Sequence, residues 1–420
     1  MKAKSLLYLL CTVSSFTLFA QGAKQRELID NNVVIQPGAA RLDLYLPLLQ
    51  GKSVAIFANQ TSMVGNTHLV DTLIRSGIKV VKIFGPEHGF RGDADAGEHV
   101  GDAIDKKTGV PVVSLYGDHK KPTAADVKDV DILLFDMQDI GVRFYTYISS
   151  LQYYLEAALE LHKPLLLLDR PNPNGFYVDG PILDMKFKSF IGMQPIPIVY
   201  GMTMGEYARM LLGEKWLSEN ANAINSYNIS TQPTADTAFH FMVIKCMGYT
   251  HKSKYQLPVM PSPNLKSMEA IYWYPSTCFF EGTVFSEGRG TDKPFEYIGH
   301  PLMPSTMYAF VPSPNAGAKS SKCFYQRCYG WDLSGNINSI LKKLDNRIQL
   351  SYILDAYKLF PGKDSFFLKN NFINKLAGND LLQSQIKQGM TASEISASWQ
   401  PALQSFKKIR KKYLLYADFE

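Results

Sequence analysis

Apolar runs that each end in a polar or glycine-rich turn recur through the first half of the chain. Their nearly continuous apolar, β-branched character is typical of strands that are buried on both faces of a parallel sheet. The pattern therefore predicts such a sheet. The runs are SVAIFANQ at 53–60, VVKIFGPEH at 80–88, PVVSLYG at 111–117, DILLFDMQ at 131–138 and PLLLLDRPN at 164–172.

Helical spacing of apolar residues lies between these runs, most clearly in FYTYISSLQYYLEAALELH at 144–162. Strands that alternate with helices indicate an α/β fold, because the helices then cover both faces of the sheet. We therefore predict a doubly wound α/β domain over roughly residues 25–200.

The pattern changes after about Met202. A short helix-like segment, TMGEYARMLLGEKWL, is followed by mixed strands and by long loops that contain Pro, Gly and Ser, and helical spacing returns from about Asp332. These features predict a second, smaller domain of mixed α/β structure over residues 201–420. No low-complexity linker separates the halves, so we expect the two domains to pack against each other.

The N-terminus has the pattern of a secretory signal peptide. Lys2 and Lys4 precede an apolar run from Leu6 to Ala20, which is shorter than the roughly 20 apolar residues that a membrane span needs. We expect cleavage after Ala20, which removes residues 1–20, Cys11 among them. The mature chain is then an exported protein, periplasmic or secreted, without an integral membrane segment.

Composition and charge exclude several other classes. A chain with 46% hydrophobic and 20% charged residues is ordinary for a globular protein, which argues against disorder. The formal net charge is +6, and removal of Lys2 and Lys4 leaves +4 (6 − 2). Because no dominant basic block precedes KKIRKK at 407–412, binding to nucleic acid is not expected.

Four cysteines remain in the mature chain. In an oxidising compartment the close pair Cys323 and Cys328 is predicted to form a disulfide, and its spacing without nearby paired histidines is poor for zinc. Cys246 and Cys278 are predicted to be small buried residues.

Polar side chains gather directly after three of the predicted strands. In open α/β sheets, ligands bind beyond the carboxyl ends of the strands, where the connecting loops converge. We therefore predict that these three clusters share one site. They are Glu87, His88 and Arg91 after VVKIF at 80–84, Asp136, Gln138, Asp139 and Arg143 after DILLF at 131–135, and Asp169, Arg170, Asn172 and Asn174 after PLLLL at 164–168.

Five long blocks resemble the signature blocks of exo-β-N-acetylmuramidases of the NamZ/YbbC type. The likeness runs in order from about Ile56 to Pro301 and continues more weakly to the C-terminus. It implies a Rossmann-like N-terminal domain, a smaller C-terminal domain, an active cleft between them, and release of terminal N-acetylmuramic acid from the non-reducing ends of peptidoglycan fragments and MurNAc-GlcNAc glycans. It gives no metal, and no cofactor is expected. The blocks are FGPEHGFRGDADAGEHVGD, LLFDMQDIGVRFYTYISSL, LLDRPNPNGFYVDGPIL, LPVMPSPNLKSMEAIYWYPSTCFFEGT and SEGRGTDKPFEYIGHP.

Glycoside cleavage needs a carboxylic acid that protonates the leaving oxygen. Glu87 fits this role, since it lies in a short turn with Gly85, Pro86 and Gly89 after a buried strand, and the resemblance also points to the glutamate of GPEHG. His88 beside it is a further catalytic candidate. The second carboxylate and the stereochemical course stay open, including assistance by the acetamido group of the substrate. The candidates for the second carboxylate are Asp136, Asp139, Asp169, Glu281 and Glu287.

N-acetylmuramic acid carries a lactyl ether with a carboxylate, so a selective site should offer a fixed cation. Arginine suits this task because its planar fork can hold a carboxylate through two parallel hydrogen bonds. We predict that at least one of the arginines in the signature blocks binds the lactyl group. These are Arg91, Arg143, Arg170 and Arg289.

Two other functions remain open at this stage. A metal-dependent amidase or esterase would use mixed His and carboxylate ligands, although HGFRGDADAGEH lacks the i, i+4 histidine pair of a helical zinc site. A non-catalytic protein that binds muramyl sugars would stack aromatic rings on them. No GxGxxG follows the first strand, so nucleotide binding is not expected. The metal candidates are His88, Asp93, Asp95, Glu98, His99 and Asp136, and the stacking candidates are Tyr145, Tyr147, Tyr272 and Trp273.

Overall fold

An eight-stranded sheet forms the first part of the fold. The structure is a computed structural model that describes residues 34–87, 89–90, 101–224, 229–230 and 240–420. From Ile35 to Glu420 the chain is one compact unit. The predicted signal peptide lies outside the described residues. The strand order is β5-β6-β4-β1-β7-β8-β10-β9, with β1 (Ser53–Ala58), β4 (Lys79–Gly85), β5 (Ala103–Ile104), β6 (Pro111–Ser114), β7 (Ile132–Asp136), β8 (Leu165–Leu168), β9 (Ile229–Ser230) and β10 (Phe241–Ile244).

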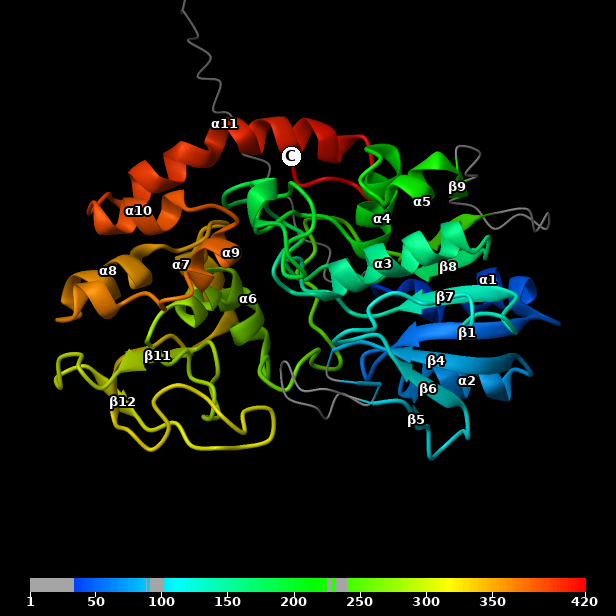
Figure 1. The fold of residues 1–420 in the computed structure, drawn as a ribbon, viewed down its shortest axis with the longest axis horizontal. Coiled ribbons are helices and arrows are strands. Elements are labelled where there is room, and N and C mark those ends of the chain that lie inside the picture. The colour runs from blue at the N-terminus through cyan, green and yellow to red at the C-terminus, as the bar shows by residue number, and fades with distance from the viewer. Residues whose placement is uncertain (1–33, 88, 91–100, 225–228, 231–239) are drawn as a thin grey trace, which may run out of the picture. The chain divides into compact units, whose positions relative to one another are not determined.

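All strand pairs of this sheet are parallel except that of β5 with β6 (Figure 1). The five apolar runs are therefore confirmed as neighbouring strands of a parallel sheet, β1, β4, β6, β7 and β8. The last two strands, β9 and β10, come from beyond residue 200 and continue the sheet past β8.

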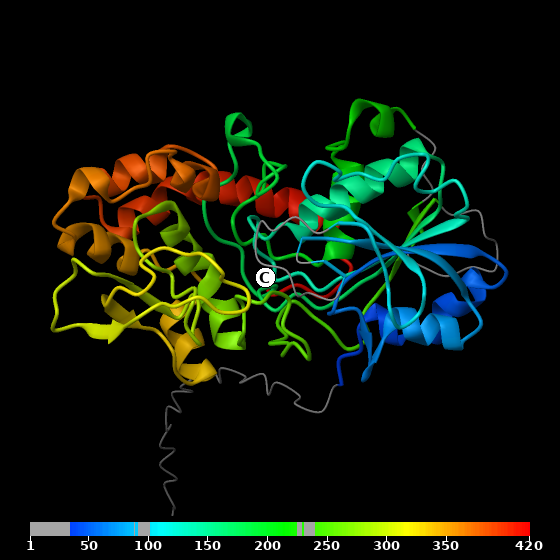
Figure 2. The same cartoon turned by 60° about the horizontal axis from the view of Figure 1, so that its bottom comes forward.

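Alternate side chains of the sheet enter two separate cores, because successive residues of a strand point to opposite faces. Val54 and Ile56 of β1 pack on one face, and Ala55 and Phe57 pack on the other. The first face is covered by α1 (Leu42–Leu49) and α2 (Leu69–Arg75), and the second by α3 (Tyr147–Glu160) and α4 (Met204–Gly213) (Figure 2). This confirms the doubly wound α/β prediction.

Two of these helices correspond to segments that the sequence predicted. Helix α3 occupies most of the segment 144–162. Helix α4 begins after Thr203, whose side chain accepts a hydrogen bond from the backbone N–H of Glu206 while the Glu206 carboxylate accepts one from the backbone N–H of Thr203. This reciprocal cap satisfies two backbone donors that a helix start otherwise leaves without partners.

The second part of the fold has a three-stranded antiparallel sheet of order β11-β13-β12, with helices around it. This agrees with the predicted smaller domain of mixed structure. The elements are α6 (Met268–Thr277), η3 (Cys278–Gly282), β11 (Tyr297–His300), β12 (Tyr308–Phe310), β13 (Cys328–Asp332), α7 (Ile337–Leu344), α8 (Ser351–Leu359), η4 (Lys363–Ser365), α9 (Phe372–Ala377), α10 (Leu381–Lys387) and α11 (Ala392–Lys411). The short elements of the first part are η1 (Gly38–Ala40), β2 (Met63–Val64), β3 (Thr67–His68), η2 (Met185–Phe187) and α5 (Glu219–Ala223).

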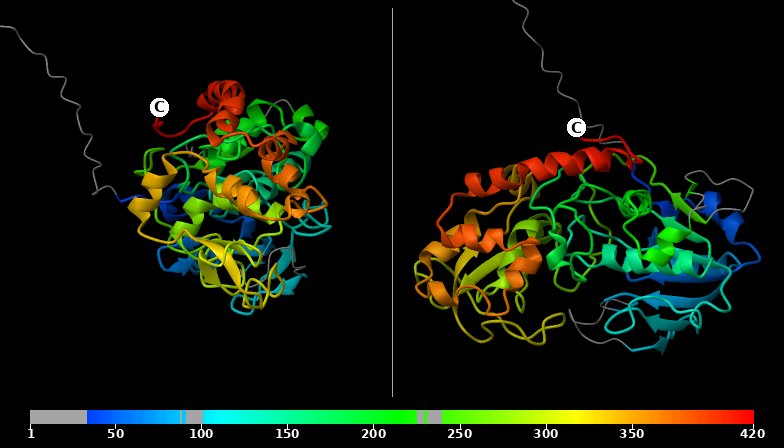
Figure 3. Two further views of the ribbon diagram at one scale, coloured as in Figure 1. Left: turned by 90° about the vertical axis from the view of Figure 1, so that its left-hand side faces the viewer. Right: turned by 45° about the horizontal axis from the view of Figure 1, so that its top comes forward.

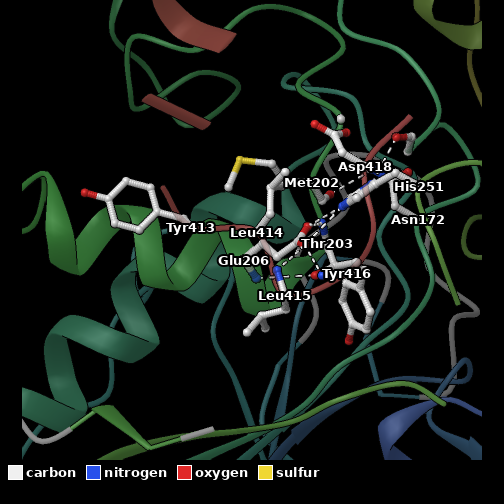
Figure 4. Close-up of polar contacts among 12 residues, drawn as sticks. Asn172, Met202, Thr203, Glu206, His251, Tyr413, Leu414, Leu415, Tyr416 and Asp418 are labelled. Carbon is white, nitrogen blue, oxygen red and sulfur yellow. Dashed lines mark hydrogen bonds and ion pairs between the residues drawn. The ribbon is translucent and has the colours of Figure 1, made fainter. Parts of the chain in front are cut away.

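The segment after α11 returns to the large sheet (Figure 3). The backbone N–H of Leu415 donates to Glu206 Oε1 at 2.7 Å (Figure 4). The Tyr416 hydroxyl donates to Asp169 Oδ2 at 2.6 Å. Asp418 accepts two hydrogen bonds of 2.8 Å from the buried Arg410 guanidinium. The C-terminus is thereby fixed to α4 and to the loop that follows β8.

Cys323 and Cys328 are free thiols, so the disulfide predicted for them was wrong for this structure. The two thiols contact each other, and each also lies near a backbone carbonyl, Val284 O at 3.8 Å for Cys323 and Gln326 O at 3.7 Å for Cys328. Cys246 and Cys278 are buried, as predicted. Within the part of the chain that the structure describes, none of the helices combines the length and apolar character that crossing a bilayer requires.

Candidate active site

A pocket of about 190 Å³ joins the turn after β4 to the segment that surrounds η3. Two carboxylates, an arginine and several aromatic rings face it. The stacking candidates Tyr145, which precedes α3, and Tyr147, which begins it, are among them, whereas Tyr272 and Trp273 are not. The lining residues are Glu87, Phe144, Tyr145, Thr146, Tyr147, Ile191, Ser262, Asn264, Leu265, Tyr274, Glu281, Arg289, Phe295 and Phe372.

Glu87 is held by a hydroxyl group on each of its carboxylate oxygens. The Tyr116 hydroxyl donates to Oε1 at 3.0 Å, and the Thr146 hydroxyl donates to Oε2 at 2.8 Å. Burial and the nearby Glu87 carboxylate raise the pKa of Tyr116, so its hydroxyl remains a donor at neutral pH. The orientation of the carboxyl group is thus fixed from the end of β6 and from the start of α3.

The turn that carries Glu87 depends on glycine. The backbone N–H of Gly89 donates to the Pro86 carbonyl at 2.9 Å, and Gly89 has a φ of +75°, which residues with a Cβ rarely adopt. The chain therefore reverses immediately after β4 and leaves the Glu87 side chain at the pocket wall.

A network of ion pairs contributes to another part of the pocket wall. Arg289 Nη2 lies 2.6 Å from Glu281 Oε1, Arg289 Nε lies 3.3 Å from Glu287 Oε1, and Lys322 Nζ lies 2.7 Å from Glu287 Oε2. Burial opposes the charge on Arg289, but the Glu281 and Glu287 carboxylates outweigh it and raise the pKa of Arg289. Burial likewise opposes the charge on Glu287, but Lys322 and Arg289 hold its pKa below the usual range.

Only part of this network faces the pocket. Glu281 and Arg289 line it, whereas Glu287 is enclosed behind them with 2% of its surface exposed. Gly288 directly precedes Arg289 with a φ of +78°, and a Cβ there would lie 2.7 Å from two backbone oxygens. The backbone conformation that places Arg289 at the pocket therefore requires glycine at position 288.

Asp136 and Arg170 pair with each other instead of lining the pocket. Arg170 donates through Nε at 2.6 Å and through Nη2 at 2.8 Å to the two oxygens of Asp136, and both side chains are buried. The Arg170 guanidinium also donates to the Met63 carbonyl at 3.0 Å. This bidentate pair connects the ends of β7 and β8 to the hairpin β2–β3.

Arg143 donates four hydrogen bonds to backbone carbonyls, those of Pro181, Ile196, Leu376 and Ala377. It is fully enclosed, and burial lowers its pKa to about 9. Two of these carbonyls belong to the end of α9, so Arg143 connects the loop after β7 to the second part of the fold.

The remaining predicted residues of the strand ends also bond within the loops. Gln138 donates to the Asp139 and Pro171 carbonyls, Asn172 to the Met202 carbonyl, and Asn174 to the Ile140 carbonyl. Asp139 accepts from the Gly141 backbone and the Tyr200 hydroxyl, and Asp169 accepts from Thr203, Gly205 and Tyr416. Burial raises the pKa of both aspartates to about 6.

Several candidates lie outside the described residues, namely His88, Arg91, Asp93, Asp95, Glu98 and His99. Among the residues that are described, no group of three or more His, Cys, Asp or Glu side chains could hold a metal ion. Of the four arginines proposed for carboxylate recognition, Arg289 lines the pocket, and Arg143 and Arg170 bond elsewhere.

Some pocket residues that the sequence did not select carried a usable signal. Tyr116 lies at the end of the predicted run PVVSLYG, and Thr146 lies in a segment already predicted as helical. Ser262, Asn264 and Phe372 carry no such signal, because long-range packing brings them to the pocket.

Comparison with known proteins gave matches over nearly the whole chain. The family model described as exo-beta-N-acetylmuramidase NamZ, N-terminal, matches residues 54–269, and its C-terminal counterpart matches residues 272–416. The peptidoglycan beta-N-acetylmuramidase NamZ of Bacillus subtilis (strain 168) is 40% identical over 392 residues, which cover 89% of each chain.

Two crystal structures of DUF1343 family proteins from Bacteroides fragilis NCTC 9343 are also similar. One has a TM-score of 0.81 with 45% identity, over 92% of this chain and 99% of the other. The second has a TM-score of 0.73 with 26% identity, over 91% of this chain and 99% of the other.

Proposed function

Because the chain belongs to the NamZ family of exo-β-N-acetylmuramidases, we propose that the pocket at Glu87 is its active site. The protein is a glycoside hydrolase that releases N-acetylmuramic acid from the non-reducing ends of peptidoglycan-derived glycans. One observation carries the proposed location. A carboxyl group oriented by two hydroxyl donors shares a pocket with a second carboxylate and an arginine.

Glu87 is the proton donor in this proposal. Cleavage of a glycosidic bond needs a proton on the leaving oxygen while positive charge develops at the anomeric carbon. The bonds from Tyr116 and Thr146 hold the Glu87 carboxyl group in one orientation, so the proton is presented from a fixed direction.

Glu281 is the second carboxylate in this proposal, since it lines the pocket and Glu287 does not. Its pairing with Arg289 at 2.6 Å fixes its position. The stereochemistry of the first product, followed by NMR, will distinguish its roles. Inversion indicates activation of water, whereas retention indicates a covalent or acetamido-assisted intermediate.

Arg289 recognises the lactyl carboxylate in this proposal. Its Nη2 and Nε atoms face Glu281 and Glu287, which leaves Nη1 for the substrate. Lys322 neutralises the charge of Glu287. Of the two glutamates near Arg289, Glu281 is therefore the one left to balance its positive charge.

We also propose that the chain is exported and acts in the periplasm or outside the cell. The N-terminal pattern of Lys2, Lys4 and the apolar run to Ala20 supports this. Sequencing of the N-terminus of the protein recovered from the periplasmic and culture fractions tests it. A mature protein that begins at Gln21 is expected, and retention of Met1 in the cytoplasm would contradict the proposal.

The activity itself is tested with the purified mature chain and two chromogenic substrates, a β-N-acetylmuraminide and the matching β-N-acetylglucosaminide. We expect cleavage of the muraminide alone, unchanged by a chelator. Binding without product release would indicate a sugar-binding protein, and loss of activity with the chelator would indicate a metal-dependent hydrolase.

A further inference from the structure

A second pocket, of about 660 Å³, lies on the first part of the fold and has no role in the function proposed so far. Its wall runs from Gln60 at the end of β1, past His68 of the hairpin β2–β3, and along α2 to Arg75. Lys107 also lines it. The seven residues of α2 span about 10 Å at 1.5 Å per residue, so the pocket is long enough for more than one sugar unit.

Hydrogen bonds join the wall of this second pocket to the wall of the candidate active site. Gln60 Nε2 donates to the Pro261 carbonyl at 3.1 Å, and the same oxygen accepts hydrogen bonds of 3.0 Å from the Tyr145 and Tyr147 hydroxyls. Tyr145 and Tyr147 line the active-site pocket, and Gln60 lines the second pocket. A single backbone carbonyl therefore connects the walls of the two pockets.

The second pocket also lies on the side of the active site where Glu87 is. Three residues after Glu87, the ring of Phe90 packs edge-on against His68, with 5.0 Å between the ring centroids. His68 belongs to the wall of the second pocket, and Glu87 belongs to the active site. A proton donor stands beside the leaving group, so the leaving part of the substrate extends in this direction.

The far end of the second pocket is positively charged. Lys107 pairs with the largely buried Asp71, which neutralises it. Arg75 is exposed and makes no hydrogen bond or ion pair with any residue that the structure describes. Its guanidinium is therefore available to an anionic group of a ligand that lies along α2.

We propose that the second pocket binds the part of the glycan that leaves with the aglycone, and that Arg75 pairs with the lactyl carboxylate of the next N-acetylmuramic acid. This inference rests on the proposed function. N-acetylmuramic acid alternates with N-acetylglucosamine in such glycans, so the next carboxylate lies one disaccharide beyond the cleaved sugar. Helix α2 is about 10 Å long and ends at the positively charged Arg75, which agrees with a carboxylate that lies beyond the first leaving sugar.

Two trisaccharides test the proposal with the purified mature protein. Both begin with N-acetylmuramyl-N-acetylglucosamine, and they differ only in the third sugar, which is either N-acetylmuramic acid or N-acetylglucosamine. The initial rate of N-acetylmuramic acid release is measured for the wild type, Arg75→Ala and Arg347→Ala. Arg347 is an exposed arginine of the second part and serves as the matched control.

We expect Arg75→Ala to raise KM about two- to fivefold for the trisaccharide with the second muramic acid, the effect of losing one exposed ion pair. KM for the other trisaccharide, and both values for Arg347→Ala, should equal those of the wild type. An equal KM change on both trisaccharides, or none, would overturn the role of Arg75 while leaving the activity intact. If the wild type released no N-acetylmuramic acid from either substrate, the proposed function would fail together with this inference.

Discussion

In the proposed function, the side chain of Arg289 selects the substrate by pairing with the lactyl carboxylate. The same side chain pairs with Glu281 and Glu287. Truncating one member of a buried charge pair typically costs about 2 to 5 kcal/mol. We therefore expect Arg289→Ala to lower kcat/KM for a β-N-acetylmuraminide by about 30-fold or more.

A methyl ester of the same substrate separates recognition from damage to the site. The ester has no charge for Arg289 to hold, so Arg289→Ala should affect the ester much less than the acid. Equal losses on the acid and the ester would show that Arg289 only supports Glu281 and Glu287.

Asp139 makes the stability of the protein depend on pH. Burial raises its pKa to about 6, against an unperturbed value of about 3.9. The folded state therefore binds this proton more tightly than the unfolded state does. The resulting stabilisation is complete below about pH 4 and is lost as the pH rises through about 6.

Urea unfolding of the wild type and Asp139→Asn between pH 4 and 7 measures this effect. The free energy of unfolding of the wild type should fall by about 2 to 3 kcal/mol relative to the variant over this range, at 1.36 kcal/mol per pH unit. Asp169 contributes a pH dependence of the same sign, but it is present in both proteins, so its contribution cancels in the comparison. Parallel curves for the two proteins would contradict the raised pKa of Asp139.

At the scale of residues, the sequence singled out Glu87 as the proton donor, which stays a prediction, but it could not show which of the other polar residues at the strand ends face the pocket. The rule that ligands lie beyond strand ends selected Glu87, Asp136 and Arg170 alike. In the structure Asp136 and Arg170 satisfy each other through two hydrogen bonds, and such pairing between different strands leaves no trace in a local pattern.

At the scale of elements, the segment after α11 joins the C-terminus to the large sheet. The Tyr416 hydroxyl donates to Asp169 and accepts from the backbone N–H of Cys246 at 2.9 Å. Removing one partner of a buried hydrogen bond costs about 1 to 3 kcal/mol. We expect Tyr416→Phe to lower the free energy of unfolding by about this amount.

Urea unfolding at pH 7 tests this, with Tyr325→Phe as the control because 75% of the Tyr325 surface is exposed. The control should unfold like the wild type. Wild-type stability of Tyr416→Phe would show that the C-terminal segment contributes no stabilising contact through this hydroxyl.

The strands and main helices could be predicted because their signals are local. The apolar runs gave β1, β4, β6, β7 and β8, and helical spacing gave α3. The contact of Arg143 with the end of α9 spans 233 and 234 residues. The periodicity of apolar residues in the two segments does not indicate this contact, because it reflects only how each segment folds locally.

At the scale of the whole chain, the active-site pocket exists only because distant segments converge. Its lining extends from Glu87 to Phe372, through residues on both parts of the fold. The Rossmann-like part supplies Glu87, the proposed proton donor, and the second part supplies Glu281 and Arg289. The domain limits predicted at residues 200 and 201 remain a prediction, whereas the large sheet runs on to β10.

The most direct test of this account is the rate at which Glu87→Gln releases free N-acetylmuramic acid from N-acetylmuramyl-N-acetylglucosamine. Glutamine keeps the shape of the side chain but cannot supply the proton, and general acid catalysis contributes typically about 10²- to 10⁴-fold. We predict a fall of that size in kcat with an unchanged folded state, while the exposed control Glu219→Gln keeps the wild-type rate. A folded Glu87→Gln that releases the monosaccharide at nearly the wild-type rate would contradict the assignment of the active site.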